Sequence, residues 1–237
     1  MPDGLAELRA ELATATRILA GHGLIGLFGH VSVLTDDPQR YLICPGAGTR
    51  KDRCRSTDII ELDLDDEFRP GLPLELYMHS EAHRLGHEVG SLIHVHSPAL
   101  VTLAAMAQPP TQLLMLQASF WPQAMPVWEE PDLVRDRAAG RRLVGILGEQ
   151  PLALLRWHGA VIVGRTLRQA VSRALLAEEH AKQLVAALSH GRALAPLPGT
   201  ADRTALGERM DSANFHNLQW AYASSFVTVE PDPGGPG

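Results

Sequence analysis

The sequence is poor in cysteine, in basic clusters and in long hydrophobic runs, and each shortage excludes a class of protein. Only two cysteines occur among 237 residues, Cys44 and Cys54, which is too few for a disulfide framework and predicts a reducing, cytoplasmic setting. No apolar stretch reaches the roughly 18 residues of a membrane span, and the first residues lack the pattern of a signal peptide. Lysine and arginine number 21 against 27 aspartates and glutamates, a net charge of −6, so nucleic acid and anionic membranes are unfavourable partners.

The overall composition is that of an ordinary globular protein. Hydrophobic residues make up 45% of the chain and charged residues 20%. The length permits one large domain with a substantial core. Because we find neither an internal repeat nor a break in composition, we expect a single domain over residues 1–230. The segment 231–237 consists of Pro, Gly and one Asp and is expected to be a disordered tail.

The spacing of apolar residues predicts an alternation of helices and short strands. Predicted helices cover residues 5–19, 75–87, 99–107, 131–147, 166–190 and 211–222. Predicted strands cover residues 31–34, 41–44, 60–65, 91–96, 152–157 and 161–163. Residues 108–130 form a proline-rich irregular connection, and residues 196–199 form a loop. This order indicates an α/β sandwich around a mixed sheet, and it leaves the order of the strands open.

The most informative motif is a pair of histidines inside a predicted strand. In Ile93-His94-Val95-His96-Ser97-Pro98, His94 and His96 point to the same face because side chains alternate along a strand. Two imidazoles on one face suit a divalent metal such as zinc, manganese or iron. The alternative, from these residues alone, is a pair of hydrogen-bonded core histidines.

Two further residues strengthen the metal interpretation. His158 follows a predicted strand and precedes Gly159, which permits close approach of another backbone. Glu75 stands at the start of a predicted helix that leads to the histidine pair. Three imidazoles and one carboxylate make a catalytic metal site with room for substrate oxygens. A glutamate at a helix start is also a common solvated capping residue, and a lone histidine is commonly structural.

With these residues in place, the sequence resembles the class II aldolase and adducin family over roughly residues 5–190. The motifs that carry the resemblance, in order, are Glu75-Leu-Tyr-Met-His79, His94-Val-His96-Ser-Pro98, His158-Gly159 and Val163-Gly164 before the long helix. The resemblance implies a three-layer α/β/α sandwich around a mixed, mainly antiparallel central sheet. It also implies one divalent metal ion (Zn, Mn or Fe) per subunit, held by His94, His96 and His158. Glu75 would be a further ligand or the acid/base, and the assembly would be a homotetramer with active sites between subunits.

The motif Phe28-Gly29-His30-Val31-Ser32-Val33 stands where sugar-phosphate aldolases of this family carry Gly-Asn-x-Ser. The hydroxyl residues with which those aldolases hold phosphate are missing from Cys44-Pro45-Gly46-Ala47-Gly48 and from Leu72-Pro73-Leu74. Gly-His-Val-Ser resembles a branch that includes decarboxylases of hydroxylated aromatic dicarboxylates. We therefore expect a metal-dependent carbon–carbon lyase that decarboxylates a hydroxylated aromatic or heteroaromatic carboxylate, with the metal stabilising the enolate charge.

Four other residues complete the predicted site. His30 is a second candidate acid or base, with a buried structural role as the alternative. Arg50 suits a substrate carboxylate because of its planar guanidinium, with a solvated surface charge as the alternative for it and for Lys51. Ser32 and His79 are candidate substrate contacts.

The helix that carries His79 has a histidine stripe. His79, His83 and His87 fall on one helical face. We interpret the stripe as an ordinary polar face on which His79, one turn after Glu75, comes nearest to the metal.

Three other functions remain open from the sequence. One is an aldolase acting on a hydroxy-keto acid or a sugar phosphate, and another is a mononuclear non-haem iron oxygenase that uses the same ligands. The third is a non-catalytic interaction protein of the adducin type, which would not need the complete ligand set. If the protein is any of these enzymes, its partner is a small-molecule substrate. The sequence assigns no role to Tyr222.

Overall fold

The computed structural model describes residues 2–191, 195 and 200–227 of the chain. The expected loop at 196–199 and tail at 231–237 lie outside the described residues. The helices are α1 (Pro2–Gly21), α2 (Leu76–His83), α3 (Pro98–Ala104), α4 (Arg137–Leu147), α5 (Leu167–Ser189), α6 (Thr200–Met210) and α7 (Ala213–Ser224). The strands are β1 (His30–Leu34), β2 (Arg40–Ile43), β3 (Ile60–Asp63), β4 (Ser91–Val95), β5 (Val127–Trp128), β6 (Leu152–Leu155) and β7 (Gly159–Gly164).

One sheet of the described residues contains all these strands, in the order β3-β2-β1-β4-β7-β6-β5. Every neighbouring pair is antiparallel except β5 and β6, which are parallel. The register pairs His30 with His94 and His94 with Val161, so β1, β4 and β7 lie side by side in the middle. Because these pairs are antiparallel, the start of β1, the end of β4 and the start of β7 lie together at the same end of the strands.

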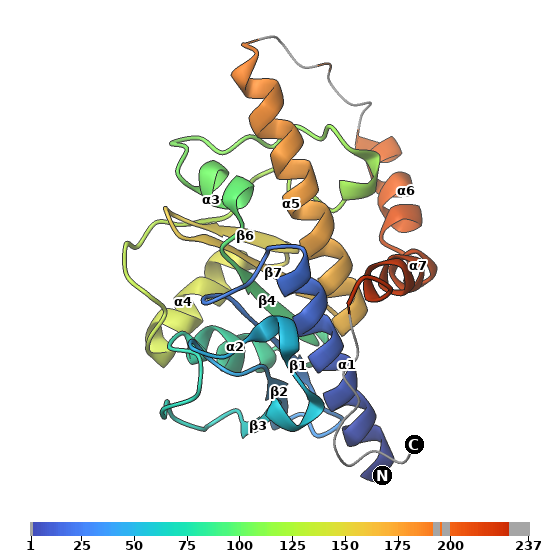
Figure 1. Cartoon of the computed structure of the whole chain (residues 1–237). Helices are drawn as coiled ribbons and strands as arrows, with labels where there is room; N and C mark the ends of the chain where they lie inside the picture. The colour runs from blue at the N-terminus through green and yellow to red at the C-terminus, as the bar shows by residue number, and fades with distance from the viewer. Residues whose placement is uncertain (1, 192–194, 196–199, 228–237) are drawn as a thin grey trace.

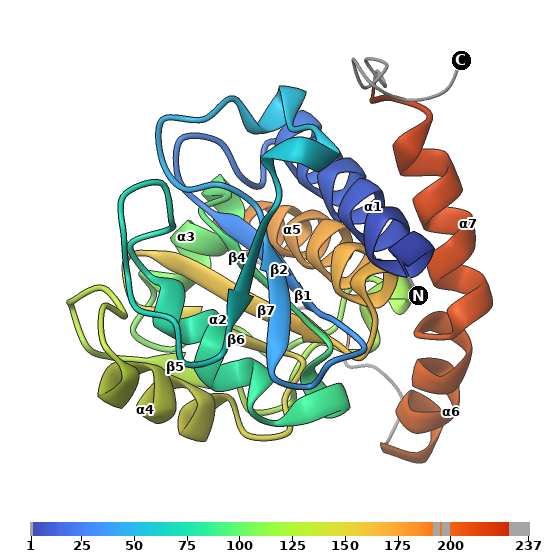
Figure 2. The same cartoon turned by 90° about the horizontal axis from the view of Figure 1, so that it is seen from below.

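Helices cover both faces of the sheet, which confirms the expected sandwich (Figures 1 and 2). Helices α1, α3 and α5 cover one face, and α2 and α4 cover the other; α6 and α7 lie outside α1 and α5. The alternation along β4 serves both layers, because Ile93 and Val95 belong to the core cluster under α1, α3 and α5, whereas Leu92 packs with α2 and α4. His94 therefore projects toward the α2 layer.

Some predicted boundaries are wrong, and helix α6 is missing from the prediction. Helix α2 ends at His83, and the chain turns at Gly86, whose φ is +66°. Helix α4 begins at Arg137 rather than near residue 131, because the Asp136 side chain caps it by accepting a hydrogen bond from the Ala139 N–H at 2.8 Å. Strand β5 is missing from the prediction, since two residues are too few to show a period.

The long helix α5 begins as predicted, because the Thr166 side chain accepts a hydrogen bond from the Gln169 N–H at 3.2 Å. None of the helices in the described part of the chain combines the length and apolar character that a membrane crossing requires.

Candidate metal centre

The histidine pair stands at the end of the central strand β4. His94 is its penultimate residue and fully buried, and His96 directly follows the strand. The His96 N–H donates to the carbonyl of Leu24 at 3.2 Å, which continues the extended backbone past the strand end. The two ring centroids lie 4.5 Å apart. The period-two alternation that the sequence indicated therefore places both imidazoles together.

His158 reaches the same place from the turn between β6 and β7. Its N–H donates to the Leu155 carbonyl at 2.9 Å, which closes the turn immediately before β7. Its ring centroid lies 4.9 Å from that of His94 and 4.6 Å from that of His96. The three rings thus form one cluster from two neighbouring strands.

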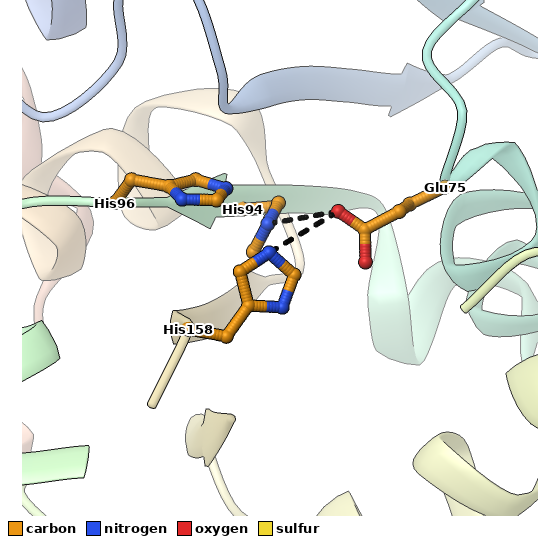
Figure 3. Close-up of side chains that lie close together, drawn as sticks. All are labelled: Glu75, His94, His96 and His158. Carbon is orange, nitrogen blue, oxygen red and sulfur yellow. Dashed lines mark ion pairs between the residues drawn. The ribbon is translucent and has the colours of Figure 1, made fainter. Parts of the chain in front are cut away.

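Glu75 completes the cluster from the N-terminal end of α2. Its carboxylate makes no capping bond to the helix. One oxygen, Oε1, accepts the Val134 N–H at 3.3 Å, and Oε2 lies 3.2 Å from Nε2 of His94 and 3.6 Å from Nε2 of His158. Figure 3 shows the carboxylate pointing at these two rings. The capping interpretation of Glu75 is therefore excluded.

The donor atoms suit a divalent cation. One ligand atom from each of Glu75, His94, His96 and His158 lies within 4.8 Å of the other three. Because the Ala160 carbonyl only accepts, His94 Nδ1 carries the proton of their 3.0 Å hydrogen bond, and Nε2 is the ring atom available to a metal. This buried Nε2 has no hydrogen-bond partner among the described residues, and a metal ion would supply one.

The electrostatics of the cluster favour the same chemistry. Burial and the neighbouring His94 and His158 lower the pKa of His96 to about 3, so this ring is neutral and able to ligate at pH 7. Burial acts to raise the pKa of Glu75, but His94, His158 and the Val134 N–H outweigh it and lower the pKa to about 2. An ionised Glu75 beside a neutral His96 gives two groups in the states that bind metal.

A cavity of about 260 Å³ opens onto the cluster. It is lined by Leu27, Phe28, Gly29, His30, Ala47, Lys51, Pro73, Leu74, Glu75, His96, Leu133 and His158. The described lining residues include neither serine nor threonine, and Lys51 is the one lysine or arginine among them. The wall is therefore mainly apolar, and Glu75, His96 and His158 are the cluster members that line it.

Lys51, rather than the predicted Arg50, is the basic residue that lines the cavity. The Arg50 side chain is 66% exposed, pairs with Asp52 and lies outside the cavity lining. Lys51 is 2% exposed, and its Nζ donates to the carbonyl oxygens of Gly26 at 3.1 Å and Leu27 at 3.4 Å. Burial lowers the pKa of Lys51. The sequence favoured Arg50 for its planar guanidinium, and the fold turns Lys51 inward instead.

Ser32 and His79 lie behind the cavity rather than in it. Both are fully buried, and the Ser32 Oγ contacts Nδ1 of His79 at 2.6 Å and Nε2 of His83 at 2.7 Å. His79 Nε2 in turn lies 2.6 Å from Nδ1 of His30, which does line the cavity. The predicted polar face is therefore wrong, because His79 and His83 on α2 are buried. His87 is exposed, but it lies in the turn after the helix.

Gly159 is the position in this site where an added methyl group has the clearest cost. A Cβ built there lies 2.0 Å from the Val95 carbonyl oxygen, so the start of β7 could not approach β4 with any other residue.

We expect Gly159→Ala to lose about 3 kcal/mol of unfolding free energy, measured by urea denaturation of the metal-free protein. Gly145→Ala on α4, where nothing lies within 4 Å, is the control and should be neutral or stabilising. Equal stability of the two variants would contradict this packing.

Comparison with known proteins places this geometry in a family. Residues 10–185 match the class II aldolase and adducin N-terminal domain. The chain is 31% identical over 212 residues to the 3,4-dihydroxyphthalate decarboxylase of Terrabacter sp. (strain DBF63), which covers 84% of this chain and 88% of that protein. A solved aldolase II superfamily protein from Pseudomonas syringae has a TM-score of 0.79 at 20% identity, over 94% of this chain and 93% of that one. The L-fuculose-1-phosphate aldolase of Thermus thermophilus has a TM-score of 0.67 at 28% identity, over 80% and 100%.

The matched residues contain each cluster member, Glu75, His94, His96 and His158, as well as the central strands that carry the histidines. The solved structures share the fold over most of the chain, and the resemblance inferred from the motifs is confirmed. The chain belongs to the class II aldolase and adducin family.

Proposed function

We propose that this metal-dependent lyase decarboxylates a hydroxylated aromatic dicarboxylate of the 3,4-dihydroxyphthalate type. The observation that carries the proposal is the apolar cavity directly on the Glu75, His94, His96 and His158 cluster, with Lys51 as its one lysine or arginine among the described lining residues. The apolar lining residues Phe28, Leu74 and Leu133 suit an aromatic ring, whereas a sugar phosphate would find no serine or threonine among the described lining residues. The decarboxylase relative from Terrabacter supports the same substrate class.

The reaction replaces a carboxylate on a ring carbon with a proton and releases carbon dioxide. The adjacent hydroxyl loses its proton while the ring carbon that carries the carboxylate gains one, so that this oxygen becomes a ring ketone. When carbon dioxide leaves, the electron pair of the broken bond passes through the ring back to that oxygen and the aromatic ring is restored. We propose His94, His96 and His158 as the metal ligands; a bound divalent cation supplies positive charge to stabilise that oxygen. His30 and Glu75 border the same cavity and are the groups available to take the hydroxyl proton and to deliver one to carbon.

The proposal is tested with purified protein of measured metal content. Elemental analysis identifies which of zinc, manganese or iron is bound. We expect carbon dioxide release from 3,4-dihydroxyphthalate, with one equivalent of dihydroxybenzoate formed and no oxygen consumed. Aldehyde release from L-fuculose 1-phosphate without carbon dioxide release would identify an aldolase instead. Oxygen uptake by the iron-loaded protein would identify an oxygenase.

Lys51 is proposed to hold the carboxylate that the substrate retains. An ammonium has three donors, and the two carbonyl contacts leave one for the cavity. We expect Lys51→Met to raise KM by about tenfold or more, the cost of a lost charged hydrogen bond, with a smaller change in kcat. Steady-state kinetics checks this. Arg50→Met is the matched control, because Arg50 pairs with Asp52 on the surface; a larger effect there than at residue 51 would reverse the assignment.

We also propose that the protein is a cytoplasmic homotetramer with active sites between subunits. Three apolar side chains of the cavity lining are more than half exposed, namely Leu27, Phe28 and Leu74, and so is Trp157 beside His158 in the chain; their exposure supports burial against another subunit. Both cysteines are free and buried, as suits a reducing compartment. Light scattering should give a mass of about four times 25.7 kDa. A monomeric mass would exclude shared sites.

A further inference from the structure

Behind the cavity, a serine and three histidines form an unbroken chain of hydrogen bonds. It begins at the Val89 carbonyl, which lies 3.0 Å from Nδ1 of His83. Nε2 of His83 lies 2.7 Å from the Ser32 hydroxyl, and the hydroxyl lies 2.6 Å from Nδ1 of His79. Nε2 of His79 then lies 2.6 Å from Nδ1 of His30. The chain therefore connects a backbone oxygen to the cavity wall through side chains that are almost completely buried.

The rings in this chain are neutral. Burial lowers the pKa of His83 to about 4. His79 is fully buried and His30 is 6% exposed, and an unpaired buried charge is costly. None of these three rings is ion-paired with a carboxylate among the described residues. A neutral imidazole has one N–H donor and one bare acceptor nitrogen, so each bond in the chain constrains the next.

The direction of the whole chain follows from its first member. The Val89 carbonyl only accepts, so Nδ1 of His83 carries the proton and Nε2 of His83 is bare. The Ser32 hydroxyl must donate its single proton to that nitrogen, so its oxygen accepts from Nδ1–H of His79. His79 Nε2 is then bare and accepts from Nδ1–H of His30. The remaining nitrogen, Nε2 of His30, carries no proton.

This nitrogen has no hydrogen bond to another described residue, and His30 lines the cavity. We infer that Ser32, His79 and His83 are positioning residues that fix the tautomer of His30, so that its Nε2 accepts a hydrogen bond from a substrate hydroxyl. The inference rests on the proposed function for the identity of the substrate. It predicts selectivity for a ligand with a ring hydroxyl over the same ligand without one, since the latter leaves Nε2 unpaired.

The first test measures this selectivity at equilibrium with a pair of unreactive probes. Calorimetry of the metal-loaded protein gives Kd for 3,4-dihydroxybenzoate and for benzoate, and the ratio of the benzoate Kd to the 3,4-dihydroxybenzoate Kd reports recognition of the hydroxyls. We expect the ratio to fall about tenfold in Ser32→Ala, which removes both hydrogen bonds of the hydroxyl. We expect the same fall in His79→Leu. His79→Gln retains an acceptor for His30 Nδ1–H and should keep the ratio within about twofold.

A merely structural role for these residues predicts a different pattern. Loss of packing would weaken the binding of both probes to the same extent. The inference instead requires an unchanged Kd for benzoate and an unchanged metal content. An unaltered ratio in Ser32→Ala and His79→Leu, with both folded, would overturn it.

The second test reads the tautomer directly and does not depend on substrate or turnover. Nitrogen-15 NMR of histidine-labelled, zinc-loaded protein distinguishes a protonated from a bare ring nitrogen, and the His30 signals are assigned by their loss in His30→Asn. We expect Nδ1–H with bare Nε2 in the wild type and a mixture in Ser32→Ala. A proton on Nε2 in the wild type would refute the inference. If 3,4-dihydroxyphthalate is not decarboxylated but the tautomer is as expected, the proposed function fails and the positioning role stands.

Discussion

We expect His94→Ala to abolish both bound metal and turnover. His94 is fully buried, and its Nε2 faces the Glu75 carboxylate with no other partner among the described residues. Without this imidazole, the remaining ligands come from a strand end, a turn and a helix start. A metal ion supplies several kcal/mol of charge stabilisation, which corresponds to a loss of about 10³-fold or more in kcat. Elemental analysis after dialysis and carbon dioxide release measure the two effects separately.

His87→Ala is the matched control for that experiment. His87 lies in the same histidine-rich part of the chain but is exposed, and it lines neither the cavity nor the cluster. It should retain full metal content and activity. Normal metal content in His94→Ala, or equal losses in the two variants, would exclude the metal centre described here.

The second large effect is expected at Glu75. Glu75→Gln keeps the shape of the side chain but removes the negative charge that faces His94 and His158. Loss of either an acid/base group or an anionic ligand should lower kcat by at least about 10²-fold. The measurement is kcat at saturating 3,4-dihydroxyphthalate, alongside metal content.

Metal content in Glu75→Gln separates the two roles of the carboxylate. A variant that keeps its metal but loses turnover assigns Glu75 to proton transfer, and a variant that loses both assigns it as a ligand. Glu61→Gln is the control, because Glu61 pairs with Arg9 and Arg40 away from the cavity. Wild-type kcat in Glu75→Gln would remove this residue from the mechanism.

The part of the site that the sequence predicts well is the part with a strict period. His94 and His96 share a face because side chains alternate along a strand. His158 and Glu75 were candidates from their positions at a strand end and a helix start, and the family motifs gave them roles. The layers of the fold followed from the same patterns of apolar residues. Boundaries were less accurate where one side chain decides them, as at the Asp136 cap of α4.

Other features depend on contacts that no local pattern contains. Arg50 and Lys51 have the same charge, and which of them is buried follows from how their loop packs against the carbonyls of Gly26 and Leu27. The burial of His79 and His83 depends on Ser32, about 50 residues away in sequence but adjacent across the α2–sheet interface. Helical periodicity alone gave a polar face because histidine is commonly a surface residue.

The antiparallel arrangement of β1, β4 and β7 has a consequence for what this protein tolerates elsewhere. The cluster histidines lie where β4 ends and β7 begins, beside His30 at the start of β1. The β1–β2 turn at Asp36–Gln39 follows the opposite end of β1. The length of that strand, about 13 Å at 3.3 Å per residue, therefore separates the turn from His30. That turn is exposed throughout. An affinity tag or a fluorescent reporter inserted there should leave catalysis intact, and natural relatives are free to differ in length at the same place.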